Sequence, residues 1–254
     1  MSDRSIAARA IALLDLTELG DAASEADIRA LCAKARGGGA VPAVAAVCVW
    51  PRHVALARGL LHGSRIRVAT VINFPAGTAP RDVVIAEAHD ALGNGADEID
   101  LVMPYAAFLA GDAAAAGTMI TRVKAVLPPG RRLKVILETS AYPDRATIRA
   151  ASDLAIAAGA DFIKTSTGKI AGGASLDAAR VMLEAIRASG RDVGFKPSGG
   201  IRTLADAKAY LALADAVMGT GWAAPATFRF GASGLHGALA GVLGGAGTTE
   251  ATGY

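Results

Sequence analysis

Two stretches of the chain decide the fold class: Phe162-Ile163-Lys164-Thr165-Ser166-Thr167-Gly168 and Val193-Gly194-Phe195-Lys196-Pro197-Ser198-Gly199-Gly200. Each is a short apolar run that ends in a lysine and continues into a glycine-containing turn. Residues 176–188, between them, space their apolar side chains at three and four, as an amphipathic helix does. A buried strand, a helix and a second buried strand in this order predict a right-handed parallel crossover.

Similar apolar runs recur along the chain, separated by alanine-rich segments. We expect strands at residues 45–50, 67–73, 98–104, 134–138, 162–164 and 193–196, with two shorter candidates at 214–219 and 228–233. We expect helices at residues 81–93, 106–126, 144–158 and 176–188. About eight units of this kind predict an α/β protein with one (β/α)8 TIM barrel. No Gly-x-Gly-x-x-Gly turn follows the first expected strand, which disfavours a dinucleotide-binding sheet.

The segments outside the expected barrel are assigned to the same domain, which spans residues 1–254. The first segment, up to about residue 39, is expected to form N-terminal helices that pack on the barrel. The tail from about residue 244 is rich in glycine and threonine, and we expect it to be mobile. Left-handed helix ends are expected at Gly93, Gly95, Gly159 and Gly190.

Composition narrows the function classes. Hydrophobic residues make up 52% of the 254 residues and charged residues 19%, which excludes a disordered chain. The formal charge of +3 comes from scattered lysines and arginines, so no nucleic-acid partner is expected. No signal peptide and no apolar run of about 20 residues is recognisable, which predicts a cytoplasmic protein without a membrane span. Cys32 and Cys48 are too few for a disulfide framework.

Polar residues that end or interrupt the apolar runs are candidates for catalysis, because barrel active sites lie at the carboxyl ends of the strands. Lys164, Lys196, Asp100 and Glu138 meet this rule. A lysine that closes a buried strand is dehydrated, and a second ammonium nearby disfavours its charge further, so its pKa falls. The free amine can then attack a carbonyl group. Two alternatives stay open: the lysines could extend to solvent, and Asp100 could serve structural pairing alone. Glu138 is interpreted as a structural partner of the same cluster.

Two glycine-containing turns could cradle an anion. Gly199-Gly200 precedes Ile201-Arg202-Thr203, where a helical segment begins, and backbone amides at such a place can bind phosphate. The turn at residues 230–234 precedes the last helical segment, a position at which many barrels bind phosphate. An ordinary tight turn is the alternative in both cases. The four histidines lack the spacing of metal ligands, so no metal and no cofactor are expected.

These motifs together resemble the deoxyribose-phosphate aldolase family, in its longer bacterial form. The resemblance runs from Asp15-Leu16-Thr17 through Val71-Ile72-Asn73-Phe74-Pro75 to the terminal Tyr254, and it is most specific in the two lysine stretches. It implies reversible cleavage of 2-deoxy-D-ribose 5-phosphate to acetaldehyde and D-glyceraldehyde 3-phosphate through a Schiff base. It also implies that no metal or organic cofactor takes part, and it makes a homodimer plausible.

The resemblance assigns roles to individual residues. Lys164 matches the Schiff-base lysine, and Lys196 matches the partner that lowers its pKa and assists proton transfer. Asp100 matches the acid/base group that acts on the substrate hydroxyl. Tyr254 matches a C-terminal tyrosine that takes part in protonating the enamine.

The resemblance also places the phosphate end of the substrate. The residues implied around the phosphate are Gly168, Lys169, Gly200, Arg202 and Ser233. Thr17 would lie near the substrate chain. Gly234 stands where the family commonly has a second serine, which leaves only backbone donation there. Two alternative functions stay open: another Schiff-base phosphosugar aldolase, and a sugar-phosphate-binding protein without catalytic activity.

Overall fold

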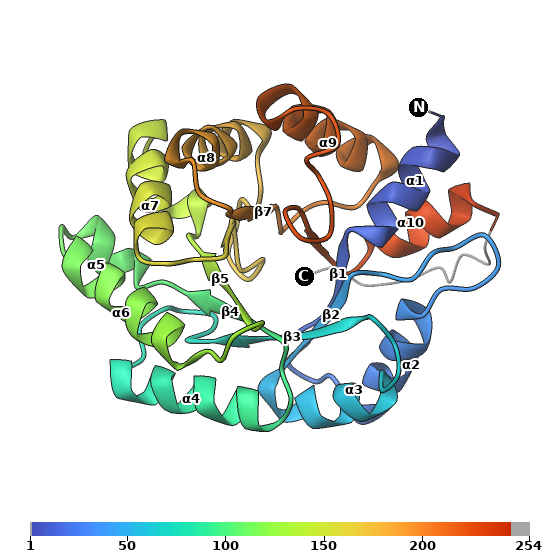
Figure 1. Cartoon of the computed structure of the whole chain (residues 1–254), viewed down its shortest axis with the longest axis horizontal. Helices are drawn as coiled ribbons and strands as arrows, with labels where there is room; N and C mark the ends of the chain where they lie inside the picture. The colour runs from blue at the N-terminus through green and yellow to red at the C-terminus, as the bar shows by residue number, and fades with distance from the viewer. Residues whose placement is uncertain (1, 245–254) are drawn as a thin grey trace.

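The computed structural model describes residues 2–244, and these form a barrel of eight parallel strands surrounded by helices (Figure 1). The strands are β1 (Leu14–Glu18), β2 (Ala46–Val49), β3 (Arg67–Ile72), β4 (Glu98–Val102), β5 (Arg132–Ile136), β6 (Phe162–Lys164), β7 (Gly194–Lys196) and β8 (Phe230–Ala232). They pair in the order β7-β6-β5-β4-β3-β2-β1-β8. Two isolated parallel bridges, Phe195 with Phe228 and Ser198 with Gly231, join the last two strands and bring the ring to closure. The predicted TIM barrel is confirmed.

The helices lie outside the ring and connect successive strands. They are α1 (Asp3–Ala12), α2 (Glu25–Ala35), α3 (Val54–Leu60), α4 (Arg81–Gly93), α5 (Tyr105–Leu109), α6 (Ala113–Val126), α7 (Arg145–Ala157), α8 (Leu176–Ser189), α9 (Leu204–Met218) and α10 (Leu235–Val242). Two 3-10 turns, η1 (Pro51–His53) and η2 (Thr139–Ala141), follow β2 and β5. Helices α4, α7 and α8 agree with the expected ranges to within one residue.

Along each strand, side chains alternate between the outer, apolar face of the barrel and the inner face, which carries the polar groups. In β4, Ile99 and Leu101 belong to the main core that packs against the helices, whereas Asp100 is buried outside that core. In β2, Val47 packs outward in the same core, while Cys48 belongs to a separate small cluster with Ala69 and Val71. Since successive side chains of a strand point to opposite faces, this second cluster and the charged residues line the interior of the barrel.

The expectation for the first segment was wrong in one respect. Residues 14–18 form β1, the first strand of the barrel, which pairs with both β2 and β8. Its run Leu14-Asp15-Leu16 alternates apolar and polar residues, but it is short and contains an acid. Only α1 precedes the barrel, and it lies beside α9 and α10 (Figure 1). Helix α2 is the first of the helices that connect strands.

The strand candidate at residues 214–219 was also wrong, because residues up to Met218 continue α9. The helix begins with a capping box in which the Thr203 and Asp206 side chains each accept from the other's backbone N–H. Asp215 faces outward and pairs with Arg9 of α1 at 3.3 Å. An apolar run of this length is compatible with either a strand or a buried helix face, so periodicity could not decide between them.

Two smaller expectations need correction. The helix predicted at residues 106–126 is divided into α5 and α6, since Gly111 has φ 94° and Asp112 caps α6 by accepting from the Ala115 N–H at 2.9 Å. Gly93 is the last residue of α4 and is not left-handed, whereas Gly95, Gly159 and Gly190 have positive φ as predicted.

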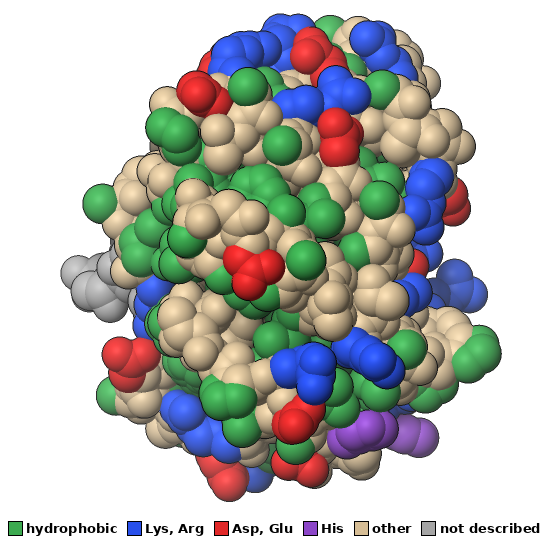
Figure 2. All heavy atoms as spheres, turned by 90° about the vertical axis from the view of Figure 1, so that its left-hand side faces the viewer, with side chains coloured by type: hydrophobic (Ala, Val, Ile, Leu, Met, Phe, Trp, Pro, Cys, Tyr) green, Lys and Arg blue, Asp and Glu red, His purple; other side chains and the backbone are tan. Residues whose placement is uncertain are grey.

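The outer surface carries charges of both signs. On the face shown in Figure 2, basic and acidic side chains are interspersed among apolar and neutral ones. Within residues 2–244, no helix combines the length and the apolar character that spanning a membrane would require.

The close contact between Gly194 of β7 and the Phe162 ring of β6 can be tested by mutation. A Cβ on Gly194 would lie 2.6 Å from Cζ of Phe162 and closer still to two other atoms of that ring. We expect Gly194→Ala to destabilise the protein by about 1–3 kcal/mol in urea unfolding, because both residues are buried and the added methyl group would overlap the Phe162 ring. Gly59→Ala is the control, since nothing lies within 4 Å of the added methyl group on α3. Equal stability of the two variants would contradict the described packing.

Candidate active site

The two lysines of the sequence motifs meet inside the barrel. Lys164 is the last residue of β6 and Lys196 the last residue of β7, and the two are partners in the strand register. Their Nζ atoms donate to the same oxygen, Oδ2 of Asp100, at 2.8 Å and 2.7 Å. Asp100 is the third residue of β4 and is fully buried. The structure therefore brings together the three residues that the sequence analysis singled out.

These three residues belong to a larger buried group, which we call the charged column. Its seven members are Asp15, Glu98, Asp100, Lys134, Lys164, Lys196 and Arg229. Glu98 is the first residue of β4 and Arg229 directly precedes β8, whereas Lys164 and Lys196 end their strands. The column therefore runs through the barrel from its amino-terminal end to its carboxyl-terminal end.

The cations at the centre and base of the column each pair with more than one carboxylate. Lys134 lies 2.7 Å from Glu98, 2.8 Å from Asp100 and 3.4 Å from Asp15. Arg229 donates to Asp15 at 2.5 Å and to Glu98 at 2.8 Å. A buried charge is tolerated when it is paired and hydrogen-bonded in this way.

The carboxyl-terminal end of the column is paired less evenly. Lys196 is held by Asp15 at 2.5 Å and by Asp100 at 2.7 Å. Lys164 pairs with Asp100 at 2.8 Å, and among the described residues this is its single carboxylate partner.

The charge count of the column singles out Lys164. The column contains four basic side chains and three carboxylates, so it is neutral only if one base gives up its proton. Arginine does not deprotonate in proteins, and Lys134 and Lys196 have the stronger carboxylate environments. Lys164 is thus the group that loses its charge at least cost.

The pKa shifts agree with this distribution. Burial lowers the pKa of Lys164 most, the neighbouring charge of Lys196 lowers it further, and the opposing attraction of Asp100 does not restore it. For Lys196, burial acts in the same direction, but Asp100 and Asp15 outweigh it and raise its pKa above the usual value. The two lysines therefore differ in the direction of their pKa shift: Lys164 gives up its proton more readily than an ordinary lysine, and Lys196 less readily.

Asp100 is held as a carboxylate. Burial alone would raise its pKa, but the charges of Lys134, Lys164 and Lys196 outweigh burial and keep the pKa well below the usual range. An acid in this state can accept hydrogen bonds and hand protons on, but it does not store one at neutral pH.

An apolar wall completes the interior near the lysines. Cys48, Ala69 and Val71 form it with Leu19, and Trp50 packs edge-on against Phe74 with ring centroids 5.5 Å apart. Burial raises the pKa of the Cys48 thiol, which supports the interpretation of Cys48 as a packed side chain. These buried apolar side chains lie near the lysines and so contribute to the dehydration of Lys164.

The first predicted phosphate turn lies directly above the lysines. The backbones after β6 and β7 approach closely, since a Cβ on Gly173 would lie 2.7 Å from the Gly199 carbonyl oxygen. The Ala174 N–H donates to that oxygen at 3.0 Å. Gly168 and Gly200 have φ of 79° and 83°, which glycine adopts without strain. The two loops thus form one glycine-lined rim at the mouth of the barrel.

The other predicted substrate contacts lie around the same mouth. Lys169 pairs with Asp21 at 2.9 Å, and the Arg202 side chain is exposed at the start of α9. Ser233 and Gly234 are half-buried between β8 and α10. Thr17 lies in β1, where its hydroxyl donates to the Asp15 carbonyl oxygen at 2.8 Å. Tyr254 and the tail from residue 245 lie outside the described residues.

The interpretation of Glu138 as a partner of the lysine cluster was wrong. Its carboxylate accepts from the Thr167 hydroxyl at 2.5 Å and from the Thr167 N–H at 3.2 Å. Glu138 has a left-handed backbone, with φ 59°, which turns its side chain toward the loop after β6. It therefore braces the glycine-lined rim instead of neutralising a lysine.

Sequence reasoning missed Asp15, Lys134 and Arg229, and it placed Glu98 only near the strand entrance. Each of these side chains interrupts an apolar run, as in Leu14-Asp15-Leu16 and Phe228-Arg229-Phe230. The sequence signal that could have identified them is the alternation of side chains along a strand, which places each of these charged residues on the inward face. A charge at such a position needs a partner from another strand, and sequence does not name that partner.

The described residues contain no cluster of three or more histidine, cysteine, aspartate or glutamate side chains arranged to hold a metal ion. The carboxylates of the column are instead engaged by lysine and arginine.

Comparison with known proteins identifies the family. Residues 9–242 match the family described as DeoC/LacD family aldolase. The chain belongs to this aldolase family. It is also 50% identical over 253 residues to a curated protein named deoxyribose-phosphate aldolase from Agrobacterium fabrum, with 99% of this chain and 97% of that protein covered. The chain is thus an enzyme of the lyase class.

Solved structures of the same family share the fold. A candidate deoxyribose-phosphate aldolase from Coccidioides immitis is 33% identical with a TM-score of 0.82, covering 92% of this chain and 86% of that one. The tetrameric deoxyribose phosphate aldolase from Aeropyrum pernix is 27% identical with a TM-score of 0.73, covering 95% and 92%. Both likenesses extend over the whole aldolase barrel.

The charged column predicts a strong effect of removing its central cation. We expect Lys134→Met to lower the free energy of unfolding by about 3–5 kcal/mol, because it leaves Glu98 and Asp100 buried without their closest shared partner. Urea unfolding measures this. Lys208→Met is the matched control: its pair with Asp3 is exposed, so its loss should cost less than about 1 kcal/mol. A Lys134→Met protein as stable as the control would contradict the pairing.

Proposed function

We propose that this aldolase reversibly cleaves 2-deoxy-D-ribose 5-phosphate to acetaldehyde and D-glyceraldehyde 3-phosphate through a Schiff base on Lys164. The observation that carries the proposal is the contrast between the two lysines. Lys164 is the base that the column leaves least paired, and its pKa is lowered, whereas the pKa of Lys196 is raised. The name of the Agrobacterium fabrum relative supports the choice of substrate.

In the first step the neutral amine of Lys164 attacks the aldehyde carbon of the open-chain sugar, forming a carbinolamine. Loss of water then leaves a protonated imine. Lys164 is 3% exposed, while Lys134 and Lys196 are completely buried. Lys164 is therefore the lysine of the three that a substrate can reach from the mouth of the barrel.

In the second step the bond between C2 and C3 of the sugar breaks. Its electron pair moves into the iminium, giving an enamine, while the C3 hydroxyl loses its proton and becomes the aldehyde of the departing three-carbon phosphate. Protonation of the enamine carbon and hydrolysis of the imine then release acetaldehyde and regenerate Lys164.

The proton transfers are assigned to Asp100 and Lys196. Both lysine Nζ atoms contact one oxygen of Asp100, so a proton can pass between them over a short path. Since Asp100 stays ionised, we assign it the relay and assign Lys196 the store of the proton. Tyr254 is the further acid that the family resemblance implies for the enamine.

The phosphate of the substrate is assigned to the glycine-lined rim. Gly168 and Gly200 expose backbone at the carboxyl ends of β6 and β7, and the Arg202 side chain lies exposed at the N-terminus of α9. A helix N-terminus and a guanidinium both favour a phosphate. Lys169, Ser233, the backbone of Gly234 and Thr17 are assigned to the remaining substrate contacts around the mouth.

Borohydride trapping tests the assignment of Lys164. Incubation with 2-deoxyribose 5-phosphate and borohydride should produce a stable adduct, and peptide mass spectrometry should locate it on Lys164. Lys164→Leu should form no adduct and release acetaldehyde at least about 10³-fold more slowly. Lys208→Met, altered on the exposed surface, should behave as the wild type.

The alternatives give different results in the same experiment. An adduct on Lys196 would reverse the roles of the two lysines. Binding of the sugar phosphate with no adduct and no acetaldehyde would favour a binding protein. A trapped adduct with another phosphosugar, formed faster than with 2-deoxyribose 5-phosphate, would change the assigned substrate.

A further inference from the structure

A second cavity opens at the end of the barrel opposite the lysines. Its volume is about 530 Å³, large enough for a small organic ligand. Its lining comes from the amino-terminal ends of the strands: Arg67, Glu98 and Arg132 are the first residues of β3, β4 and β5, and Arg229 directly precedes β8. We call it the basal pocket. No role in the proposed aldol cleavage falls on it, since the substrate enters at the carboxyl ends.

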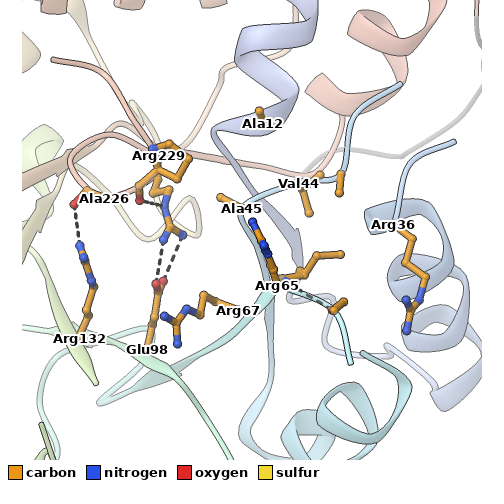
Figure 3. Close-up of a pocket in the computed structure, with 14 residues that line it drawn as sticks. Ala12, Arg36, Val44, Ala45, Arg65, Arg67, Glu98, Arg132, Ala226 and Arg229 are labelled. Carbon is orange, nitrogen blue, oxygen red and sulfur yellow. Dashed lines mark hydrogen bonds and ion pairs between the residues drawn. The ribbon is translucent and has the colours of Figure 1, made fainter. Parts of the chain in front are cut away.

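The basal pocket is lined by arginine to an unusual degree. Arg36, Arg65, Arg67, Arg132 and Arg229 border it, and Glu98 is the one acidic residue in its lining. Figure 3 shows these arginine side chains arranged around the opening, with Arg36 at its far edge, directly after the end of α2. Guanidinium groups present several N–H donors in a plane and do not lose their charge, which suits them to phosphate oxygens.

Local carboxylates neutralise only part of this positive charge, since Arg229 is paired with Asp15 and Glu98 inside the column. Glu98 is already engaged by Arg229 at 2.8 Å and by Lys134 at 2.7 Å, both within the column. Arg67 lies 3.7 Å from Asp97, but Asp97 also pairs with Arg58 and Arg131. Arg132 donates to the Ala226 carbonyl oxygen and lies over the Phe162 ring, 5.6 Å from its centroid, and no carboxylate within residues 2–244 pairs with it.

Arg65 is the clearest case. Its side chain is exposed at the rim, and within residues 2–244 its guanidinium has no hydrogen-bond or ion-pair partner. Because no other side chain in the described part of the chain engages it, the Arg65 guanidinium is available to an anion that enters the pocket.

We propose that the basal pocket is a second anion-binding site, which takes a small molecule carrying a diphosphate group. Several guanidinium groups around one cavity favour a ligand with more than one negative charge. Val44 and Ile66 lie in the same lining and offer apolar contact to the organic part of such a ligand. This site is distinct from the glycine-lined rim and does not depend on the proposed aldol reaction.

Calorimetric titration with inorganic pyrophosphate at fixed ionic strength tests the proposal. Arg65→Ser and Arg67→Ser should each weaken binding about tenfold, because each removes charged hydrogen bonds to the ligand. Both variants should fold, since Arg65 has no partner to lose and Asp97 keeps Arg58 and Arg131. Thermal unfolding checks this. Arg122→Ser, an exposed arginine on α6 away from the pocket, should bind as the wild type.

Arg202→Ser separates the two ends of the barrel. Pyrophosphate binding that persists in Arg202→Ser and weakens in Arg65→Ser places the anion in the basal pocket. The proposal is overturned if the wild type does not bind pyrophosphate, if Arg65→Ser and Arg122→Ser bind equally, or if Arg202→Ser abolishes binding. Loss of the aldol reaction in any variant has no bearing on this result, because binding is measured directly.

Discussion

The carboxylate of Asp100, shared by three lysines, is the interaction on which the site depends. Lys134 donates to one of its oxygens, and Lys164 and Lys196 donate to the other, all within 2.8 Å. A single buried carboxylate cannot fully compensate three ammonium groups, so the protonation states of the lysines are coupled. Asp15 and Glu98 supply the missing charge to Lys134 and Lys196, and Lys164 is left with a single carboxylate partner and a lowered pKa.

The barrel makes this arrangement possible because it brings inward positions of distant strands to one axis. Asp15 is in β1, Asp100 in β4 and Lys196 in β7, yet the Nζ atom of Lys196 contacts both carboxylates. The parallel register places Lys164 and Lys196 at the same height. The apolar exteriors of the same strands pack against the helices, and their burial offsets the cost of the dehydrated charges.

The sequence predicted the features that repeat or that end an element. Seven of the eight strands, the closed barrel and the meeting of Lys164, Lys196 and Asp100 follow from apolar runs and from the polar residues that close them. It did not predict β1, a five-residue strand whose apolar run is interrupted by an acid. Nor did it predict the role of Glu138, whose left-handed backbone redirects its side chain. The sequence analysis also missed Lys134, Arg229 and Asp15. Which charged side chains pair between strands depends on the register of the strands, and hydrophobic periodicity does not contain that information.

The pKa of the Lys164 amine in the free enzyme is the measurement that tests this account most directly. Titration of ¹⁵N-lysine by NMR, with the signal assigned by Lys164→Gln, would give it. We predict a pKa below the usual 10.5, so that the neutral amine gains population as pH rises through that lower value. Lys196→Met should raise it, since a like charge is removed. A wild-type value at or above 10.5 would contradict the central claim that the charged column lowers the pKa of Lys164.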